Sequence, residues 1–194
     1  MRRVILLLFL VLAGLACATR VTPTPAPSPA ATEATASEAG GKEVVNRFLL
    51  GGWVMPKGDD ARADPFAETL KAFVITTEKE LRDFLDGINL VRARGNRESL
   101  NGVASNEEMV LAAYYLWRPV KGDPLSIERV TLKETDVEVG LELLQDPQGR
   151  ESPYLMAPLS IVAVGKEDLP RGVPLRFVFL VNGEVTATQT VTLK

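Results

Sequence analysis

Apolar and polar residues alternate with a period of two along most of the chain after residue 41, which is the pattern of strands that bury one face. Seven such segments are rich in β-branched or aromatic residues and are separated by Pro, Gly, Asp or Asn: 44–54, 72–76, 108–117, 125–133, 137–144, 156–164 and 175–193. The last one contains Asn182-Gly183, a pair typical of hairpin turns, and predicts two strands. The pattern therefore predicts about seven to eight strands.

The register of this last hairpin follows from its loop length. A two-residue loop would set Phe179 opposite Thr186, whereas a three-residue loop over 181–183 would set Phe179 opposite Val185. The second register keeps apolar residues on one face and places Phe177 opposite Ala187. We therefore expect the three-residue loop, with Gly183 in the left-handed conformation.

One segment has a helical period instead. Thr77 followed by Glu80 is a capping box, and Gly87 is a stop signal. The apolar stripe between them falls at i, i+3, i+4 and i+7: Leu81, Phe84, Leu85 and Ile88. Two i,i+4 charge pairs are expected on the opposite, solvated face: Glu78 with Arg82, and Lys79 with Asp83. The whole pattern predicts an α+β, mainly β fold, as an antiparallel β-sandwich or curled sheet with one packed helix.

The N-terminus has the pattern of a secretory signal. Two arginines precede an apolar run over 4–15, which is too short to span a membrane. Gly14-Leu15-Ala16-Cys17 resembles the lipobox of bacterial lipoproteins, whose cysteine is acylated and becomes the first mature residue. We therefore expect a signal peptide over 1–16 and lipid attachment at Cys17, with an ordinary signal-peptidase cut as the alternative.

A Pro/Thr/Ala-rich stretch over 17–41 follows the signal. It contains no aromatic residue and cannot bury enough surface to offset its ordering entropy. We expect a disordered, lipid-anchored tether, whose 24 residues after Cys17 would span roughly 27 Å as flexible coil. The remaining residues, 42–194, have the length of a single β-rich globular domain.

Charge and composition exclude several classes of function. The chain has 22 basic and 25 acidic residues, no histidine and one cysteine. We expect no nucleic-acid partner, because phosphate-backbone affinity needs an excess of Lys and Arg. Without histidine or further cysteines we expect no metal and no cofactor. Asp59, Asp60 and Asp64 lack the spacing of a calcium loop and predict a solvated turn.

No catalytic residue is predicted, and we do not expect an enzyme. The chain has no Gly-x-Ser-x-Gly motif and no histidine that could activate a hydroxyl group. A hydrolase with two catalytic carboxylates stays an alternative, because only the distance between acidic side chains decides that chemistry.

The loop after the aromatic strand around residue 114 is the candidate protein-binding loop. Trp, Tyr and Arg are enriched at binding hot spots, and Pro and Gly fix the path of a loop. Its residues are Trp117, Arg118, Pro119, Lys121 and Gly122. The alternative is a core strand that ends in an ordinary turn, with Trp117 partly covered.

Several of these segments together resemble the C-terminal domain of the protease complex subunit PrcB family, over about 48–164. The resemblance lies in Phe-Leu-Leu-Gly-Gly-Trp at 48–53, Val-Ile-Thr-Thr at 74–77 before a helix, Asn-Glu-Glu-Met-Val-Leu-Ala-Ala at 106–113, the Pro/Gly loop at 117–122 and Ser-Pro-Tyr-Leu at 152–155. It implies a non-catalytic, β-rich envelope module that associates with proteases.

These inferences lead to one functional expectation. We expect a secreted protein, anchored to the cell membrane or outer envelope by its N-terminal lipid, whose domain binds another protein, with a protease as the partner that the resemblance implies. The alternatives are a structural or stress-related envelope module without a dedicated partner and, less favoured, a carboxylate-based hydrolase.

Overall fold

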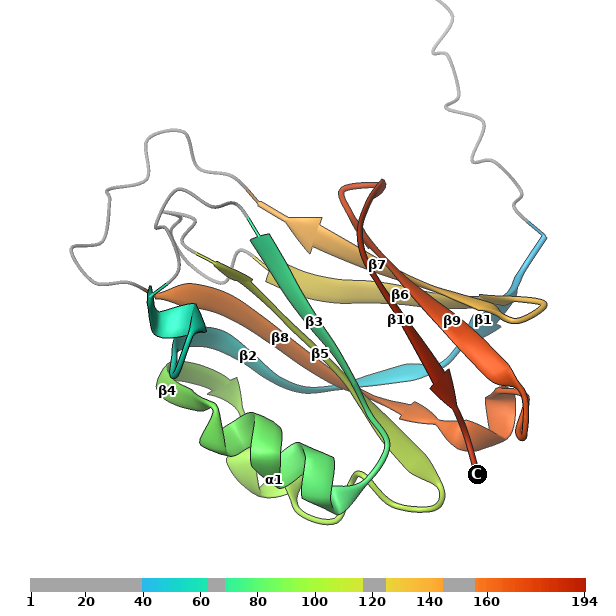
Figure 1. Cartoon of the computed structure of the whole chain (residues 1–194), viewed down its shortest axis with the longest axis horizontal. Coiled ribbons are helices and arrows are strands. Elements are labelled where there is room, and N and C mark those ends of the chain that lie inside the picture. Colours follow the sequence, from blue (N-terminus) through green and yellow to red (C-terminus); the bar gives the residue numbers. More distant parts are fainter. Residues whose placement is uncertain (1–39, 63–68, 117–124, 145–155) are drawn as a thin grey trace, which may run out of the picture. The chain divides into compact units, whose positions relative to one another are not determined.

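The computed structural model describes residues 40–62, 69–116, 125–144 and 156–194 (Figure 1). These residues form ten strands: β1 (Lys42–Val44), β2 (Asn46–Pro56), β3 (Thr69–Ile75), β4 (Ile88–Gly95), β5 (Glu108–Leu116), β6 (Leu125–Lys133), β7 (Asp136–Leu143), β8 (Ala157–Gly165), β9 (Pro174–Val181) and β10 (Glu184–Thr192). They also form helix α1 (Glu78–Asp86) and three 3₁₀ turns: η1 (Asp60–Arg62), η2 (Arg97–Leu100) and η3 (Lys166–Asp168).

The strands form two five-stranded sheets. Sheet A has the order β1-β6-β7-β9-β10, and sheet B has the order β3-β5-β8-β2-β4. This β-rich α+β fold confirms the predicted class. It has two strands more than expected, β1 and β4, and the β7–β9 pair is parallel whereas an antiparallel sheet was predicted. The parallel pair arises because β8, which lies between them in sequence, belongs to the other sheet.

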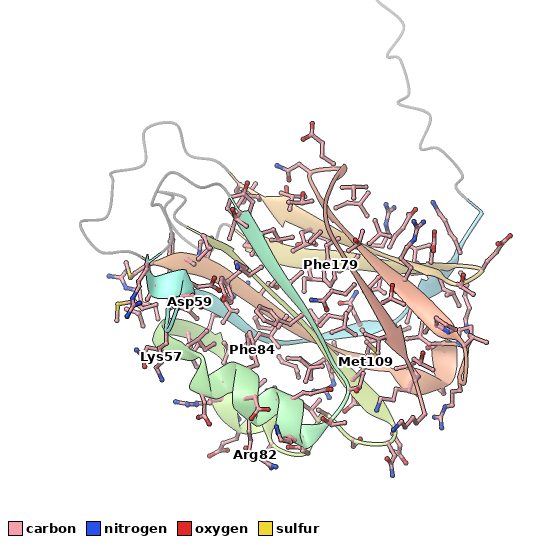
Figure 2. All side chains as sticks on the ribbon, viewed as in Figure 1. Lys57, Asp59, Arg82, Phe84, Met109 and Phe179 are labelled. Atoms are coloured by element: carbon pink, nitrogen blue, oxygen red, sulfur yellow. The ribbon has the colours of Figure 1, made fainter. Side chains whose placement is uncertain are left out.

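Sheet B is buried on both faces along β5 and β8. Its inner face packs on sheet A around Phe177, Phe179 and Met109, and its outer face packs under α1 and η2 around Leu81 and Phe84. Figure 2 shows Phe179 and Met109 between the sheets and Phe84 on the side of the helix that faces sheet B. Burial of both faces explains why β5 and β8 are nearly continuous apolar runs, whereas strands with one solvated face alternate.

The two sheets are joined along both sides of the sandwich. On one side the chain passes from β1 in sheet A to β2 in sheet B with only Val45 between them. On the other side the Gln189 side chain of β10 bonds to the outer backbone edge of β3: it accepts from Val74 N at 3.0 Å and donates to Ala72 O at 2.6 Å. The amide thus takes the place of a neighbouring strand for β3.

Helix α1 begins as the sequence predicts. Thr77 and Glu80 form the complete capping box, and Gly87 is the C-cap. Leu81 and Phe84 are buried and Leu85 is half-buried, but Ile88 lies in β4 rather than in the helix. Of the two predicted charge pairs, Lys79–Asp83 forms at 2.6 Å. The Glu78–Arg82 pair does not form, and Glu78 Oε1 is buried without a hydrogen bond.

The predicted register of the last hairpin is wrong. Val181 pairs with Glu184, so the loop has two residues, and Asn182 (φ 51°) and Gly183 (φ 88°) both adopt the left-handed conformation. This geometry matches the twist of the strands better than a longer loop does. A bulge at Thr186 then sets Phe179 opposite Ala187. Ala187 and Val191 therefore pack against the core, whereas Val185 is 63% exposed.

Strand β4 is one of the two edge strands of sheet B and pairs only with β2. Two glycines bring these strands close together. A Cβ at Gly52 (φ 129°) would lie 2.1 Å from Arg92 O, and one at Gly95 (φ 103°) would lie 2.4 Å from Leu49 O. A bulge at Val91 interrupts the ladder, because Trp53 pairs with Arg92 and Val54 pairs with Leu90. These contacts fix β4 on the sheet and leave residues 91–95 exposed.

Candidate functional site

The predicted binding loop, Trp117, Arg118, Pro119, Lys121 and Gly122, lies outside the described residues, but both of its flanks are described. β5 ends at Leu116 in sheet B, and β6 begins at Leu125 in sheet A. Both leucines are buried. Segment 117–124 therefore connects the two sheets, and it starts and ends at fixed core positions.

Segment 145–155 makes the reverse connection at the same end of the sandwich. It leaves β7 of sheet A at Leu143 and enters β8 of sheet B at Ala157. Leu143 pairs with Leu125, and Thr69 at the start of β3 pairs with Leu116. Figure 1 shows these strand ends on its upper left side. We call this end, where β5 and β7 finish and β3, β6 and β8 begin, the loop end.

A buried serine links the two sheets near the loop end. Ser160 of β8 is only 1% exposed, and its Oγ accepts a hydrogen bond at 3.1 Å from Ile127 N of β6. The register of β6 skips Glu128 beside this contact, since Ile127 pairs with Leu141 and Arg129 pairs with Gly140. A polar bond inside an apolar core fixes the relative position of two strands, because breaking it leaves an unpaired buried N–H.

A second polar contact holds η1 at the loop end. Asp60 accepts a hydrogen bond from the Tyr114 hydroxyl at 2.6 Å and pairs with Lys71 Nζ at 2.8 Å. Burial alone would raise the pKa of Asp60, but the hydrogen bonds from Lys71 and Tyr114 outweigh it and lower the pKa below 3.8. Burial, and then the Asp60 carboxylate, raise the pKa of the Tyr114 hydroxyl. The carboxylate is therefore charged and the phenol neutral at pH 7, an arrangement suited to anchoring.

The acidic turn shows no metal-binding geometry in its described part. Asp60 is engaged by Lys71 and Tyr114, Asp59 lies in the turn before η1, and Asp64 lies outside the described residues. Among the residues that the structure describes, no group of three or more Asp, Glu, His or Cys side chains is placed to hold a metal ion.

A shallow hollow of about 490 Å³ lies on the outer face of sheet A. It is lined by residues of β6, β7, β9 and the hairpin turn: Glu128, Arg129, Glu138, Gly140, Leu141, Glu142, Leu180, Asn182 and Gly183. Gly140 leaves space in it, because a Cβ there would have its nearest neighbour, Arg129 O, at 3.7 Å. Lys133 pairs with Glu138 at 2.9 Å. The hollow thus combines an apolar wall with carboxylates, and sequence reasoning missed it because its residues come from three separate strands.

Asn182 connects this hollow to the loop end. Its Oδ1 accepts from Leu143 N at 2.9 Å, and its Nδ2 donates to Leu143 O at 3.1 Å. The Asn182 side chain thereby pairs with the backbone of β7 at a position that β9, which ends at Val181, does not reach. The Asn-Gly signal predicted the turn but not this second role, which depends on a strand 39 positions away.

Strand β1, the first element in the described part of the chain, lies at the opposite end of the sandwich. Lys42 pairs with Leu132 near the end of β6, and its Nζ forms an ion pair with Asp168 at 2.7 Å. Figure 1 shows β1 on the right, away from the loop end. We call this the tether end. Cys17 and residues 17–39 lie outside the described residues, and none of the helices within the described ranges has the length and hydropathy to cross a membrane.

A buried lysine braces the tether end. Lys166 is 7% exposed, and its Nζ donates to Thr76 O at 2.9 Å and Ser105 O at 2.5 Å. Burial lowers the pKa of its ammonium group, the positive charge of Arg171 adds to this effect, and Glu80 opposes it. Because both bonds join separate loops through backbone oxygens, the geometry is that of a structural clamp.

Comparisons with protein-family models, with curated proteins and with solved structures each gave no match. The resemblance to the PrcB family therefore rests on the sequence motifs alone.

Proposed function

We propose that this chain is a non-catalytic, lipid-anchored envelope protein whose domain binds another protein through the loop end. The observation that carries the proposal is the crossing of segments 117–124 and 145–155 between the two sheets, with their flanks fixed in the core. Loops held by a rigid scaffold are where binding residues concentrate. Within that surface we assign Trp117 and Arg118 as the main contacts, because their residue types dominate binding hot spots.

The two ends of the domain support this arrangement. The domain begins at Lys42, at the tether end. The loop end lies at the other end of the strands of sheet A. The loop end is therefore separate from the place where the predicted tether joins the domain. We propose a protease as the binding partner, on the basis of the sequence resemblance to the PrcB family.

The alternative of a structural envelope module predicts that no partner is retained specifically. For the carboxylate-hydrolase alternative, the hollow offers Glu128 and Glu142, whereas its Glu138 is paired with Lys133. The hydrolase alternative requires a hydrolytic activity of the domain that falls in the double variant Glu128→Gln and Glu142→Gln.

The test measures thermal melting and partner retention together. The mature chain, with Trp117→Ala or Arg118→Ala, is used to retain partners from its own envelope fraction, and Arg82→Ala on the exposed face of α1 serves as the matched control. We expect unchanged melting and about 30-fold weaker binding for each loop variant, which corresponds to ~2 kcal/mol. Collapsed melting for Trp117→Ala with normal retention by Arg118→Ala would show that the tryptophan is a core residue and refute the proposed contact.

A further inference from the structure

The hollow on the outer face of sheet A lies in a row of neighbouring positions that crosses four strands. Arg129 of β6 pairs with Gly140 of β7, Gly140 pairs with Leu180 of β9, and Leu180 pairs with Val185 of β10. The row faces outward, because the residues on either side of Gly140 along β7 are buried between the sheets. The missing side chain at Gly140 therefore leaves a gap between an arginine and two apolar side chains.

The fold itself does not require a glycine at position 140. Gly52 and Gly95 have positive φ angles, and a Cβ at either position would strike a carbonyl oxygen. Gly140 has no positive φ, and a Cβ there would meet its nearest neighbour, Arg129 O, at an ordinary 3.7 Å. Glycine weakens the interior of a strand, and one of its uses there is to let a ligand or another chain approach closely. The open space at Gly140 thus points to an occupant.

The walls of the hollow carry an excess of negative charge. The bulge in β6 brings both Glu128 and Arg129 to the hollow, and Glu142 lines it from β7. Glu138, the third carboxylate, is paired with Lys133. Among the residues that the structure describes, Glu128 and Glu142 form no ion pair. Two unpaired carboxylates therefore face one guanidinium, in a domain that is itself acidic.

Backbone contacts hold these walls in place. The Asn182 side chain bonds to both backbone groups of Leu143, which fixes the hairpin turn beside Glu142. Arg129 and Leu180 are each paired with Gly140 in the ladder, so the two sides of the gap cannot move apart without breaking strand pairing. A site built in this way loses little conformational freedom when it is filled.

We propose that the hollow binds an arginine side chain of a partner protein. The aliphatic part of that arginine lies over Gly140 and along Leu180, since long cationic side chains pack their stems on apolar surface and keep the charge at the edge. The guanidinium group has five N–H donors, and it can bond to Glu128 of one strand and Glu142 of the next.

A protein segment fits this surface better than a free small molecule does. Pockets for small molecules bury most of the ligand, whereas this hollow is shallow and opens on a sheet face. Exposed Val185 and Thr188 continue that face beyond Leu180, so the residues next to the arginine would find further contact area. The proposal does not depend on the loop-end contact or on lipid attachment.

The test uses n-butylguanidinium, which reproduces the stem and the charged group of an arginine. The mature chain is labelled with ¹⁵N, and the amide shifts of residues 139–142 and 180–183 are followed during titration. Pentanoate, which has a similar stem and the opposite charge, is the comparison compound. The variants are Gly140→Val, Arg129→Gln, and Glu128→Gln with Glu142→Gln. The matched control is Glu98→Gln with Glu107→Gln, which removes two exposed carboxylates elsewhere.

We expect saturable shifts with n-butylguanidinium and a dissociation constant of about 1 mM, as is usual for a compound of so few atoms. Gly140→Val and the Glu128/Glu142 variant should each raise this constant about fivefold, and the control should leave it unchanged. Arg129→Gln should lower it about twofold, because a like charge is removed. Pentanoate binding as tightly, or weaker n-butylguanidinium binding in Arg129→Gln, would mean a site for anions and overturn the proposal.

A second titration identifies the source of the arginine. The peptide acetyl-Gly-Ser-Arg-Ser-Gly-amide should bind at least as tightly as n-butylguanidinium and also shift the amides of Val185 and Thr188, whereas the same peptide with glutamine in place of arginine should not bind. Weaker binding of the arginine peptide would assign the hollow to a free small cation. Without any compound, shifts that follow protein concentration would assign it to a second copy, and shifts caused by Arg150→Gln would assign it to segment 145–155 of the same chain. Each of these three results would overturn the proposal.

Discussion

The side chain of Gln189 accepts a hydrogen bond from the backbone N–H of Val74 at 3.0 Å, which joins β10 of sheet A to β3 of sheet B. The same amide donates to Ala72 O. We predict that Gln189→Leu lowers the free energy of unfolding by about 1–3 kcal/mol, because two partly buried backbone groups lose their partner. Chemical denaturation measures the change. Thr188→Ala, an exposed neighbour, should stay within about 0.5 kcal/mol, and an equal loss in both variants would contradict this role.

The Asp60 contact predicts a defined pH dependence. Its pKa is lowered in the folded state, so the unfolded chain binds more protons in the acid range and stability falls as pH decreases below about 4. Asp60→Asn should cost about 1–3 kcal/mol near pH 7. Urea denaturation at several pH values measures the difference between the two proteins. We expect it to shrink from pH 6 to pH 2.5, and a constant difference would contradict the charged contact.

Filling the hollow on sheet A should separate binding from folding. Gly140→Val adds a side chain where the nearest atom is 3.7 Å from its Cβ, and valine favours strands, so melting should be unchanged or raised. If the hollow belongs to the contact surface of the loop end, partner retention should fall about tenfold, or ~1.4 kcal/mol. Thr188→Val on β10 is the control for an added apolar group. Normal retention by Gly140→Val would exclude the hollow from that surface.

Cys17 should hold the mature protein on membranes. Replacing it as Cys17→Ala removes the acylation site that the lipobox-like sequence predicts, and the protein should move from the membrane fraction to the soluble or secreted fraction. Immunoblotting of fractionated cells measures this. Partitioning that does not change in Cys17→Ala would refute lipid attachment at this residue.

The domain should fold without the first 41 residues. The sequence of the tether offers no core-forming side chains, so residues 42–194 should melt cooperatively at the temperature of the mature chain. Differential scanning calorimetry on both forms compares them. A melting temperature lower by several degrees would show that the domain boundary lies earlier in the chain.

Local signals in the sequence were sufficient for the elements that depend on neighbours along the chain. The capping box of Thr77 and Glu80 determines where α1 begins, and β-branched and aromatic residues predicted strands at β5 and β8. The burial of both faces of these two strands was not predicted, because it depends on elements that pack on each side. Strand β4 was missed because its bulge at Val91 breaks the alternation and its exposed arginines have the composition of a loop.

Contacts between distant elements could not be predicted in this way. The parallel pairing of β7 with β9 depends on β8 joining the other sheet, and the bonds of Gln189 and Ser160 form between sheets. The hairpin shows the same limit, because a bulge at Thr186 allowed a two-residue loop and an apolar face together. The candidate site was predicted only as a loop, and the hollow beside it has no signal along the chain.

The double burial of sheet B has a consequence for how the chain is made. The run Met109–Leu116 carries no charge, and while the chain is unfolded it has the composition of a segment that aggregates through β-pairing. One edge of β5 stays unpaired until β8 has been synthesised and has folded onto it, because Glu108 pairs with Gly165 and Tyr114 with Leu159. Glu107 and Glu108 before the run have the placement of charged gatekeepers that oppose association between chains. The double variant Glu107→Gln and Glu108→Gln should therefore give less soluble protein on refolding than the unchanged chain. The melting temperature of the domain that does fold should change little.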